Sequence, residues 1–209
     1  MTIIMYNVKH GLGLGGAIVK VTREQAAANR ERILEVAGTL VRERGFDRSG
    51  VADIMKEAGL THGGFYGHFE SKDDLVAQSI AGVLTREGWL GRLTGKAKPS
   101  FADVVRAYLS PRHRDHRGAG CMFAALGSDV VHQARRVRHA FTEGFRARVE
   151  ALRAVMPGRP QDTKRDAMAA MAALVGGLML ARAVDDPGLS DEILDVVSDA
   201  LLASNRWRR

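Results

Sequence analysis

The chain has 209 residues, of which 45% are hydrophobic and 26% charged, an ordinary balance for a soluble globular protein of one or two domains. A single cysteine excludes a disulfide framework within the chain and fits a reducing cytoplasm, where we expect the protein to reside. The net charge is +7, but residues 1–72 carry only +2 of it, with 10 Lys and Arg against 8 Asp and Glu. Any nucleic-acid partner must therefore be argued from a motif rather than from net charge.

Residues 1–21 contain the stretch GLGLGG, in which Gly11, Gly13 and Gly16 match the dinucleotide-binding pattern G-x-G-x-x-G. That pattern belongs to a βαβ unit, and no second strand is predicted downstream. Lys9 and His10 interrupt the apolar run that a signal peptide would need. We therefore expect residues 1–21 to be a flexible tail and expect no cofactor.

Two helices are predicted next. The first runs from Arg23 to Arg44 and is amphipathic, with one apolar stripe formed by Ile33, Ala37, Leu40 and Val41. In Val51 to Ala58 the apolar residues recur at i, i+3, i+4 and i+7, which indicates a helix of two turns. Gly59 follows, where a helix often ends in the left-handed conformation, so the chain is expected to turn sharply here.

A further helix is predicted directly after this turn. Thr61 is placed to cap it through its side chain, and Phe65 and Phe69, four residues apart, supply its buried stripe. Ser71 and Asp74 form the pattern of a capping box, which starts another helix. Two short helices joined by a glycine turn make a helix-turn-helix, and the preceding long helix is expected to brace it.

The exposed face of the second short helix carries residues that do not favour a helix, namely His62, Gly63, Gly64, Tyr66, Gly67 and His68. Each glycine costs roughly 1 kcal/mol relative to alanine in a helix interior, so three of them indicate a gain elsewhere, such as close approach of another backbone. The helix N-terminus suits a phosphate group, and Tyr66 and Lys72 can reach neighbouring phosphates. The predicted partner is double-stranded DNA.

Residues 32–75 resemble the N-terminal domain of the tetracycline-repressor (TetR) family. The matching residues are Arg32, Ile33, Leu34, Ala37, Leu40, Gly45, Phe46, Val51, Ile54, Ala58, Gly59, Leu60, Phe65, Tyr66, Phe69, Lys72 and Leu75. The resemblance implies that the start of the second short helix reads DNA bases, and that neighbouring side chains hold phosphates. Many members have Ser or Thr where Gly50 stands, so here only the adjacent Ser49 could supply that contact. The residues expected to face DNA are Ser49, Thr61, His62, Gly63, Gly64, Tyr66, His68 and Lys72.

Beyond this stretch only further helices are predicted, so the expected fold is all-α. The helix after Ser71 is expected to run to about Leu93 and to contain the domain boundary. We assign residues 22–76 to a three-helix helix-turn-helix DNA-binding domain and residues 77–209 to a helical ligand-binding and dimerisation domain. The first elements predicted in this second domain are a short helix over residues 101–109, a basic loop over 111–120, helices over 121–133 and 137–155, and a break at Pro157 and Pro160.

The basic loop contains His113 and His116 at a spacing that is seen among zinc ligands. A zinc site needs more ligands, and Cys121 is the only nearby candidate. We therefore predict a solvated basic loop and no metal.

Residues 167–181 form a run of 15 apolar or glycine residues between Asp166 and Arg182. A bilayer needs about 20, so we expect no membrane span but a helix that is buried all round. Four small residues would let another helix approach closely, namely Ala169, Ala173, Gly176 and Gly177. The last helix, after Pro187, carries a matching apolar stripe. These two helices indicate half of a four-helix homodimer interface, as the TetR resemblance also implies, and the core of a monomer is the alternative.

The resemblance implies a DNA-binding transcription regulator, a repressor that binds a palindromic operator as a homodimer and is released by an inducer. An enzyme is not expected, since no acid–base pair, triad or phosphate loop appears with supporting context. A DNA-architectural protein without a ligand is a further alternative. Residues that could line an inducer pocket, or simply belong to the core, are Cys121, Met122, Phe123, Phe141, Phe145, Met168 and Met171.

Cys121 supports an alternative function, in which the regulator responds to thiol-reactive compounds or electrophiles. It opens an apolar helix, where the helix dipole favours an anion, and Arg112, Arg114 and Arg117 lie just upstream. Both features favour the reactive thiolate. Its position resembles that of a cysteine in several TetR branches, some of whose members respond to reactive compounds. The other interpretation is a small buried hydrophobe.

Overall fold

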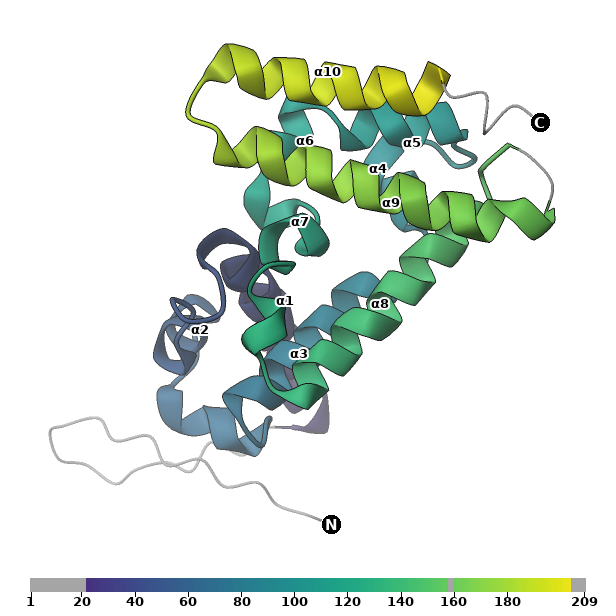
Figure 1. Ribbon diagram of the computed structural model, residues 1–209. Coiled ribbons are helices and arrows are strands. Elements are labelled where there is room, and N and C mark those ends of the chain that lie inside the picture. The colour runs from purple at the N-terminus through teal and green to yellow at the C-terminus, as the bar shows by residue number, and fades with distance from the viewer. Residues whose placement is uncertain (1–21, 158–159, 204–209) are drawn as a thin grey trace, which may run out of the picture.

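The computed structural model describes residues 22–157 and 160–203, with the backbone alone for residues 160–163. Within these residues every regular element is a helix, which confirms the predicted all-α fold. Figure 1 shows a lower part that contains α1 to α3 and an upper part in which α9 and α10 lie side by side, with α8 running between the two. The expected tail and its GLGLGG stretch lie outside the described residues.

Helix α1 spans Arg23–Arg44, the range that the sequence predicts. It begins where the side chain of Thr22 accepts a hydrogen bond from the amide of Gln25. The predicted stripe is buried, and Gly38 is buried with it. Gly45 ends the helix with φ at 82°, a value that favours glycine.

The helix-turn-helix consists of α2 (Val51–Glu57) and the short 3₁₀ helix η1 (His62–Gly67). Gly59 makes the turn with φ at 68°, and the amide of Leu60 donates to the carbonyl of Met55 at 2.8 Å. The second helix of the motif is 3₁₀ rather than α-helical. The side chain of Thr61 does not cap it, contrary to the prediction. Three glycines in six residues weaken the α-helix, and a 3₁₀ helix is common in such short pieces.

Helix α3 spans Lys72–Leu84, and the Ser71 side chain caps it by accepting from the amide of Asp74 at 3.1 Å, as predicted. The Asp74 carboxylate accepts from the amide of Glu70 at 3.2 Å, so the predicted capping box forms only in part. Helix α3 ends at Leu84 instead of continuing to Leu93. Gly88, with φ at 69°, makes the break, and the short helix α4 (Trp89–Thr94) follows. The sequence pattern missed this break because the apolar residues resume at helical spacing directly after it.

The next segments are shorter than predicted. Helix α5 spans Phe101–Tyr108, and the expected basic loop instead forms α6 (Pro111–Asp115) and the 3₁₀ helix η2 (Arg117–Ala119). Pro111 suits the first turn of α6, and Ser110 accepts from the amide of His113 as its cap. The predicted helix over residues 121–133 is divided into α7 (Met122–Leu126) and the 3₁₀ helix η3 (Val130–His132).

Three longer helices complete the fold, namely α8 (Arg135–Arg153), α9 (Pro160–Ala183) and α10 (Pro187–Ala203). Helix α8 packs along α3, and α9 packs along α10. In each of these two pairs the helices approach each other closely at a glycine. A Cβ atom added at Gly144 would overlap the side chain of Leu84, and one added at Gly177 would lie 3.2 Å from Val197. Gly177 therefore serves the contact with α10 of the same chain.

Helix α3 takes part in two separate hydrophobic cores. Leu75 belongs to the smaller core, with residues of α1, α2 and η1. Val76, Ile80 and Leu84 belong to the larger core, which residues of α5, α7, α8, α9 and α10 complete. The boundary that we propose between residues 76 and 77 thus falls in a helix that both cores share.

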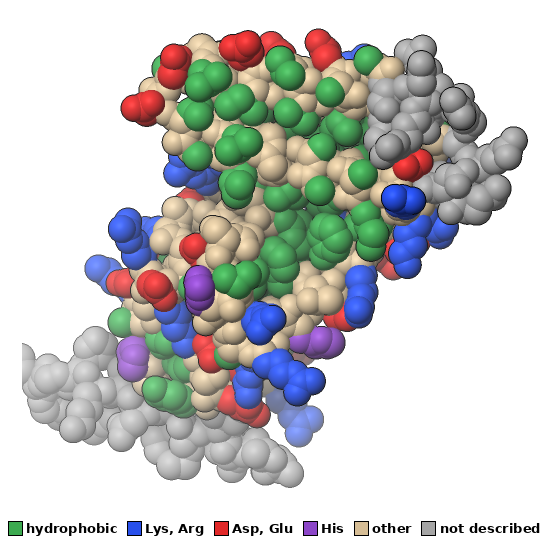
Figure 2. Space-filling view, viewed as in Figure 1, with side chains coloured by type: hydrophobic (Ala, Val, Ile, Leu, Met, Phe, Trp, Pro, Cys, Tyr) green, Lys and Arg blue, Asp and Glu red, His purple; other side chains and the backbone are tan. Residues whose placement is uncertain are grey.

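Within a single chain helix α9 is not buried all round, so the predicted burial requires a partner on its exposed side. Its stretch Lys164–Ala183 is long and apolar enough to cross a membrane by length and composition alone, a test that core helices of soluble proteins also pass. Only 39% of the most apolar part is buried. The exposed side carries Met168, Met179 and Leu180, and Figure 2 shows hydrophobic side chains gathered over α9 and α10.

Candidate DNA-binding surface and internal pocket

Helix η1 presents a small group of exposed residues on the helix-turn-helix. Thr61, His62, Gly63 and Tyr66 are exposed, and the Tyr66 side chain reaches 71% exposure. The Tyr66 ring lies edge-on to that of Phe65, with centroids 5.2 Å apart, and Phe65 is anchored in the smaller core. A hydroxyl and an imidazole that can both donate hydrogen bonds are thus displayed on one short helix.

Two of the predicted DNA-facing residues are instead buried. Ser49 is fully buried, and its hydroxyl donates to the carbonyl of Gly45 at 2.8 Å, so it does not cap α2. Gly64 is buried as well, and its amide donates to the carbonyl of Thr61 at 3.0 Å. Neither residue presents a group to the surface as it lies here, so the prediction for both is corrected.

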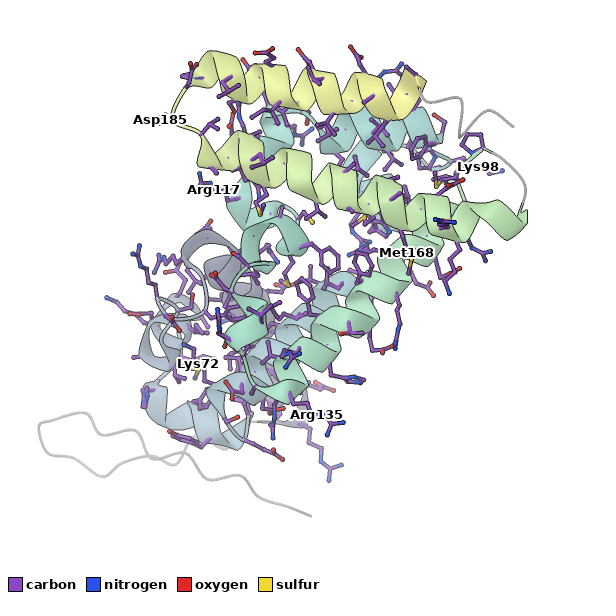
Figure 3. The ribbon with its side chains drawn as sticks, viewed as in Figure 1. Lys72, Lys98, Arg117, Arg135, Met168 and Asp185 are labelled. Atoms are coloured by element: carbon purple, nitrogen blue, oxygen red, sulfur yellow. The ribbon has the colours of Figure 1, made fainter. Side chains whose placement is uncertain are left out.

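Lys72, which is predicted to contact a DNA phosphate, makes a hydrogen bond within the chain. Its side chain is half-buried, and Nζ donates to the carbonyl of Phe46 at 2.6 Å, which ties the start of α3 to the end of α1. An ammonium group has three protons, so two remain for a phosphate. Figure 3 shows Lys72 in the lower part of the molecule, far from Asp185 at the turn between α9 and α10.

His68 lies partly buried behind η1. Burial lowers its pKa below the ordinary value of 6.5, and the nearby Arg30 lowers that pKa further. The Arg30 guanidinium is placed over the ring of Phe69, 5.1 Å from its centroid, and also donates to the side chain of Gln78. His68 is therefore a neutral ring at pH 7 rather than a surface cation.

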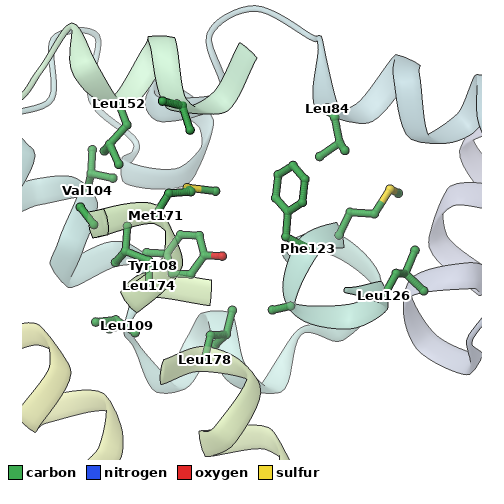
Figure 4. Packing of buried hydrophobic residues seen from close by; sticks show 14 of the residues in the cluster. Leu84, Val104, Tyr108, Leu109, Phe123, Leu126, Leu152, Met171, Leu174 and Leu178 are labelled. Carbon is green, nitrogen blue, oxygen red and sulfur yellow. The ribbon is translucent and has the colours of Figure 1, made fainter. Parts of the chain in front are cut away.

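A cavity of about 440 Å³ lies where the helix-turn-helix part meets the upper part. It is lined by Arg42, Val83, Leu84, Arg86, Trp89, Arg92, Leu93, Ala107, Tyr108, Ser110, Arg112, His113, His116, Ala119, Gly120, Cys121, Met122, Phe123, Arg148 and Met171. None of the described residues that line it is an Asp or a Glu. Figure 4 shows part of the apolar wall, with the Tyr108 hydroxyl on the side of Phe123. The internal pocket, as we call this cavity, is thus lined by both apolar and basic residues.

Two arginines reach the internal pocket from helices that are far apart in the sequence. Arg42 on α1 donates from Nε to the carbonyl of Gly118 at 2.5 Å, and Arg148 on α8 donates from Nη2 to the carbonyl of Val83 at 2.6 Å. The Arg148 guanidinium also lies 4.7 Å from the centroid of the Trp89 ring. Burial lowers the pKa of both arginines, and that of Arg148 falls to about 10. Both remain charged at neutral pH.

Cys121 lies at the start of α7 and lines the internal pocket, with its side chain half-buried. Its amide donates to Nε2 of His113 at 3.1 Å. Burial lowers the pKa of three arginines, and electrostatic interaction with Cys121 partly opposes this. They are Arg42, Arg148 and Arg182, which therefore lie near the thiol. These cations are not the upstream arginines that the sequence analysis named, because the fold brings them from α1, α8 and α9.

Burial raises the pKa of Tyr108 well above its ordinary value, and the nearby Cys121 thiol raises it further. The Tyr108 hydroxyl lies near the Cys121 thiol but does not form a hydrogen bond with it. It has no other hydrogen-bond partner among the described residues. The ring of His113 packs edge-on against that of Tyr108, with centroids 4.7 Å apart. A phenol, a thiol and an imidazole thus meet at one end of the pocket.

Of the predicted pocket residues, Cys121, Met122, Phe123 and Met171 line the cavity. Phe141 and Phe145 instead pack behind Phe123, with ring centroids 4.8 and 5.6 Å from it. Met168 lies on the exposed side of α9 and is corrected to a surface residue. Local sequence patterns did not identify Arg42, Trp89, Tyr108 or Arg148 as pocket residues. In the sequence, an arginine or aromatic residue that lacks a hydrogen-bond partner in the fold looks the same as one that has a partner.

The described residues contain no group of three or more His, Cys, Asp or Glu side chains that could hold a metal ion. The ring nitrogens of His113 are both occupied by backbone groups, the Tyr108 carbonyl and the Cys121 amide. The donor set that the spacing of His113 and His116 suggests is therefore not assembled.

An apolar face runs along the outer sides of α9 and α10. On α9 it includes Met168, Met179 and Leu180, and on α10 it includes Leu189 and Val196, which is 58% exposed. A Cβ atom added at Gly176 would meet no atom within 4 Å, so this glycine leaves the face open to a second helix. Large apolar residues at exposed positions on two adjacent helices are typical of a protein–protein contact.

Comparison with known proteins places residues 33–78 in the family described as bacterial regulatory proteins, tetR family. The chain is 35% identical over 95 residues to the HTH-type transcriptional repressor KstR2 of Mycolicibacterium smegmatis, over 40% of this chain and 46% of that protein. It is 41% identical over 59 residues to the HTH-type transcriptional regulator TtgR of Pseudomonas putida, over 28% of each chain. The chain thus spans less than half the length of these curated relatives.

Solved structures are similar over most of the chain. The reduced form of NemR from Escherichia coli has a TM-score of 0.67 and 21% identity, over 83% of this chain and 95% of that one. A TetR-family transcriptional regulator from Cytophaga hutchinsonii has a TM-score of 0.68 and 17% identity, over 86% and 96% of the two chains. At these identities the similarity shows a shared fold.

Proposed function

Because the chain belongs to the TetR family of bacterial regulatory proteins, we propose that it is a ligand-responsive transcriptional repressor. As a homodimer it binds a palindromic DNA operator, and an inducer in the internal pocket releases it. The name of the KstR2 relatives supports repression rather than activation. The relatives are transcriptional regulators, and this chain is a regulator rather than an enzyme. We place it in the cytoplasm, where the DNA is.

The observation that carries this proposal is the exposed pair of His62 and Tyr66 on η1. An exposed tyrosine that no core requires needs another explanation, and contact with a DNA phosphate supplies one. His62, at the start of the same helix, is the residue best placed to reach a base edge. The short helix with three glycines lets the two backbones come close.

The apolar face of α9 and α10 supports dimerisation. Two copies of this face would bury Met179, Leu180 and Val196 against their counterparts in a four-helix arrangement. A dimer carries two copies of η1, which explains why a palindrome with half-sites about one helical turn or a multiple apart is expected.

Selection of bound DNA from random sequence tests the proposal, followed by protection of the selected site. We expect a palindromic site and an affinity that falls steeply with salt. Val196→Asp should give monomers that bind this site weakly. Val131→Asp is the matched control, since Val131 is equally exposed but lies on η3. A non-palindromic site, or tight binding by a stable monomer, would contradict the proposal.

A second candidate function is a regulator that responds to electrophiles or oxidants through Cys121. The observation that favours it is the half-buried Cys121 thiol in the internal pocket, which Arg42 and Arg148 also line. A cysteine thiolate is the nucleophile that reacts with such compounds. Modification of Cys121 would then release the DNA.

Alkylation with N-ethylmaleimide tests this second function. The thiolate adds to the double bond of the reagent, forming a sulfur–carbon bond, and the neighbouring carbon takes up a proton from water. Mobility shifts should show loss of operator binding by the parent and none by Cys121→Ser, which must still bind DNA. Reaction of Cys121 only after unfolding, or release in the serine variant, would assign the cysteine to packing.

A further inference from the structure

The internal pocket contains an unusual set of buried donors. Arg42 Nη1, Trp89 Nε1, the Tyr108 hydroxyl and Arg148 Nη1 are buried and have no hydrogen-bond partner among the described residues. The one other side-chain polar atom in this state among those residues is Ser79 Oγ. An unpaired buried donor costs free energy, and native proteins keep few of them. Four unpaired donors on residues that line one cavity indicate a ligand that accepts hydrogen bonds.

The charge around the pocket indicates that this ligand is an anion. Five arginines line the cavity, namely Arg42, Arg86, Arg92, Arg112 and Arg148, and no described lining residue is acidic. Neither Arg42 nor Arg148 takes part in any ion pair found between the described residues. Glu43 acts on Arg42 from outside the cavity lining, whereas no Asp or Glu of the described residues is among the groups that shift the pKa of Arg148. A buried cation without a counter-ion is costly, and an anion bound at Arg148 removes that cost.

The two buried guanidinium groups are held in place before any ligand binds. Arg148, which is only 7% exposed, is fixed by the Val83 carbonyl at 2.6 Å and by its contact with the Trp89 ring. Arg42 is fixed by the Gly118 carbonyl. In each case other nitrogens make the anchoring bond, and Nη1 has no hydrogen-bond partner among the described residues. A carboxylate has two oxygens, each of which accepts such charge-assisted bonds.

We propose that the internal pocket binds an organic anion, whose carboxylate is held by Arg42 and Arg148 with Tyr108 and Trp89 as further donors. The rest of the ligand is apolar, because the remaining wall includes Leu93, Met122, Phe123 and Met171. An inorganic phosphate would leave this apolar wall uncovered. A cavity of about 440 Å³ instead fits a molecule with both a charged end and an apolar body.

A thiolate at Cys121 is the competing explanation for the unpaired cations. One sulfur atom can accept only weakly and cannot meet four donors that come from α1, α4, α5 and α8. The thiolate also leaves the cavity itself unexplained. The organic anion accounts for both the donors and the cavity, and it contacts Arg42 of the DNA-binding domain directly. The proposal therefore names the class of inducer and in this respect rests on the proposed function.

Direct binding to the full chain tests the proposal without DNA. Octanoate and cyclohexanecarboxylate are titrated calorimetrically at pH 7.5, each beside its neutral amide, and octylammonium is the cationic probe. Both carboxylates are ionised at this pH, so we expect each to bind about tenfold or more tightly than its amide, and octylammonium not to bind. In a Trp207→Phe background the fluorescence of Trp89, then the one tryptophan left, should change on binding of the carboxylates.

Variants locate the anion. Arg42→Gln and Arg148→Gln should each bring the carboxylate close to the affinity of the amide, whereas Arg148→Lys should retain part of the difference. Arg146→Gln is the matched control, because Arg146 lies on the same helix, is exposed and is not among the residues that line the cavity. Circular dichroism and thermal unfolding confirm that each variant is folded. Arg42 is half-buried, so its variant keeps the test valid if Arg148→Gln unfolds.

Three results would overturn the proposal. They are failure of both carboxylates to bind, equal binding of carboxylate and amide, and an undiminished preference in folded Arg42→Gln. Because this test does not use DNA, its outcome is separate from that of the operator selection. Carboxylate binding without any selected operator would refute the repressor function and leave the anion site in place. A selected operator without carboxylate binding would refute the anion site and leave the repressor function in place.

Discussion

The imidazole of His113 accepts a hydrogen bond from the amide of Cys121 through Nε2 and contacts the carbonyl of Tyr108 through Nδ1, at 3.1 and 2.8 Å. A neutral imidazole has one donor and one acceptor nitrogen, so the proton lies on Nδ1 and is donated to Tyr108. Burial lowers the pKa of His113, the Tyr108 carbonyl opposes this, and Arg182 lowers the pKa further. The folded protein therefore holds a neutral ring between the two segments.

This arrangement predicts that folding stability falls as the pH drops from about 7.5 to 5.5. In that range unfolded His113 takes up a proton near its ordinary pKa of 6.5, whereas the folded ring, whose pKa is lowered, takes one up only at a lower pH. His68, whose pKa is also lowered, acts in the same direction. Urea unfolding midpoints measured across this range should show the loss. His113→Gln should flatten the curve, and His139→Gln, a change at an exposed site, should leave it unchanged.

Tyr108→Phe tests the unpaired hydroxyl. Removing a buried hydroxyl that has no partner relieves a desolvation cost, so we expect the ligand-free protein to keep its stability or to gain up to about 1 kcal/mol. Most buried tyrosines lose stability on the same change, because they lose a hydrogen bond. Thermal unfolding without ligand measures the effect. A clear drop in melting temperature would mean that the hydroxyl has a partner after all.

The contact between α3 and α8 predicts opposite effects for two glycines on these helices. Gly144→Ala would push a methyl group into the buried side chain of Leu84 and should cost about 1–3 kcal/mol. Gly82→Ala on α3 meets no atom within 4 Å and should be neutral or stabilise by about 0.4–1 kcal/mol. Chemical denaturation of the two variants compares them directly. Similar values for both would show that the helices can move apart at no cost.

Three residues of the helix-turn-helix should respond differently to alanine. Tyr66→Ala should weaken DNA binding about equally at all sequences, and His62→Ala should change the preference at a base pair. Lys72→Ala should weaken binding and also lower stability, because the bond from Nζ to the Phe46 carbonyl is lost. Binding to the selected site and to random DNA separates these cases. If His62→Ala lowers both affinities by the same factor, His62 does not read bases.

Gly63→Ala tests whether close approach to DNA requires the glycine. An added Cβ meets no atom within 4 Å in the free protein, so the variant should fold as stably as the parent or gain a few tenths to about 1 kcal/mol. DNA binding should nevertheless weaken, since the methyl group would face the DNA backbone. A variant that melts higher and binds DNA as tightly as the parent would show that the glycine is merely tolerated.

Elements with strong local signals were predictable from the sequence. The ends of α1 follow from Thr22, Gly45 and a regular apolar stripe, and the start of α3 follows from Ser71 and Asp74. The break at Gly88 and the 3₁₀ form of η1 were missed, because glycine marks several outcomes and its local context does not choose among them.

The site was predictable only in part, since burial depends on segments that are distant in sequence. Ser49 has a suitable side chain for a cap, but the fold turns its hydroxyl to Gly45. Arg42 and Arg148 are ordinary charges on amphipathic helices until the fold brings both into one cavity. The apolar candidates Met122, Phe123 and Met171 were predictable because apolar residues at helical spacing are usually buried. Core residues and pocket residues are both buried, so the same spacing identifies both.

The position of Arg42 has a consequence for the engineering of chimeric regulators. Exchange of the helix-turn-helix segment between related proteins is expected to change the operator and leave the sensor intact. Here such an exchange removes Arg42 from the wall of the internal pocket, and it also removes Val41, Phe46 and Val76 from the larger core. A graft at residues 22–76 would therefore alter what the chimera senses as well as where it binds. Retaining these four side chains in the graft is the minimal way to separate the two properties.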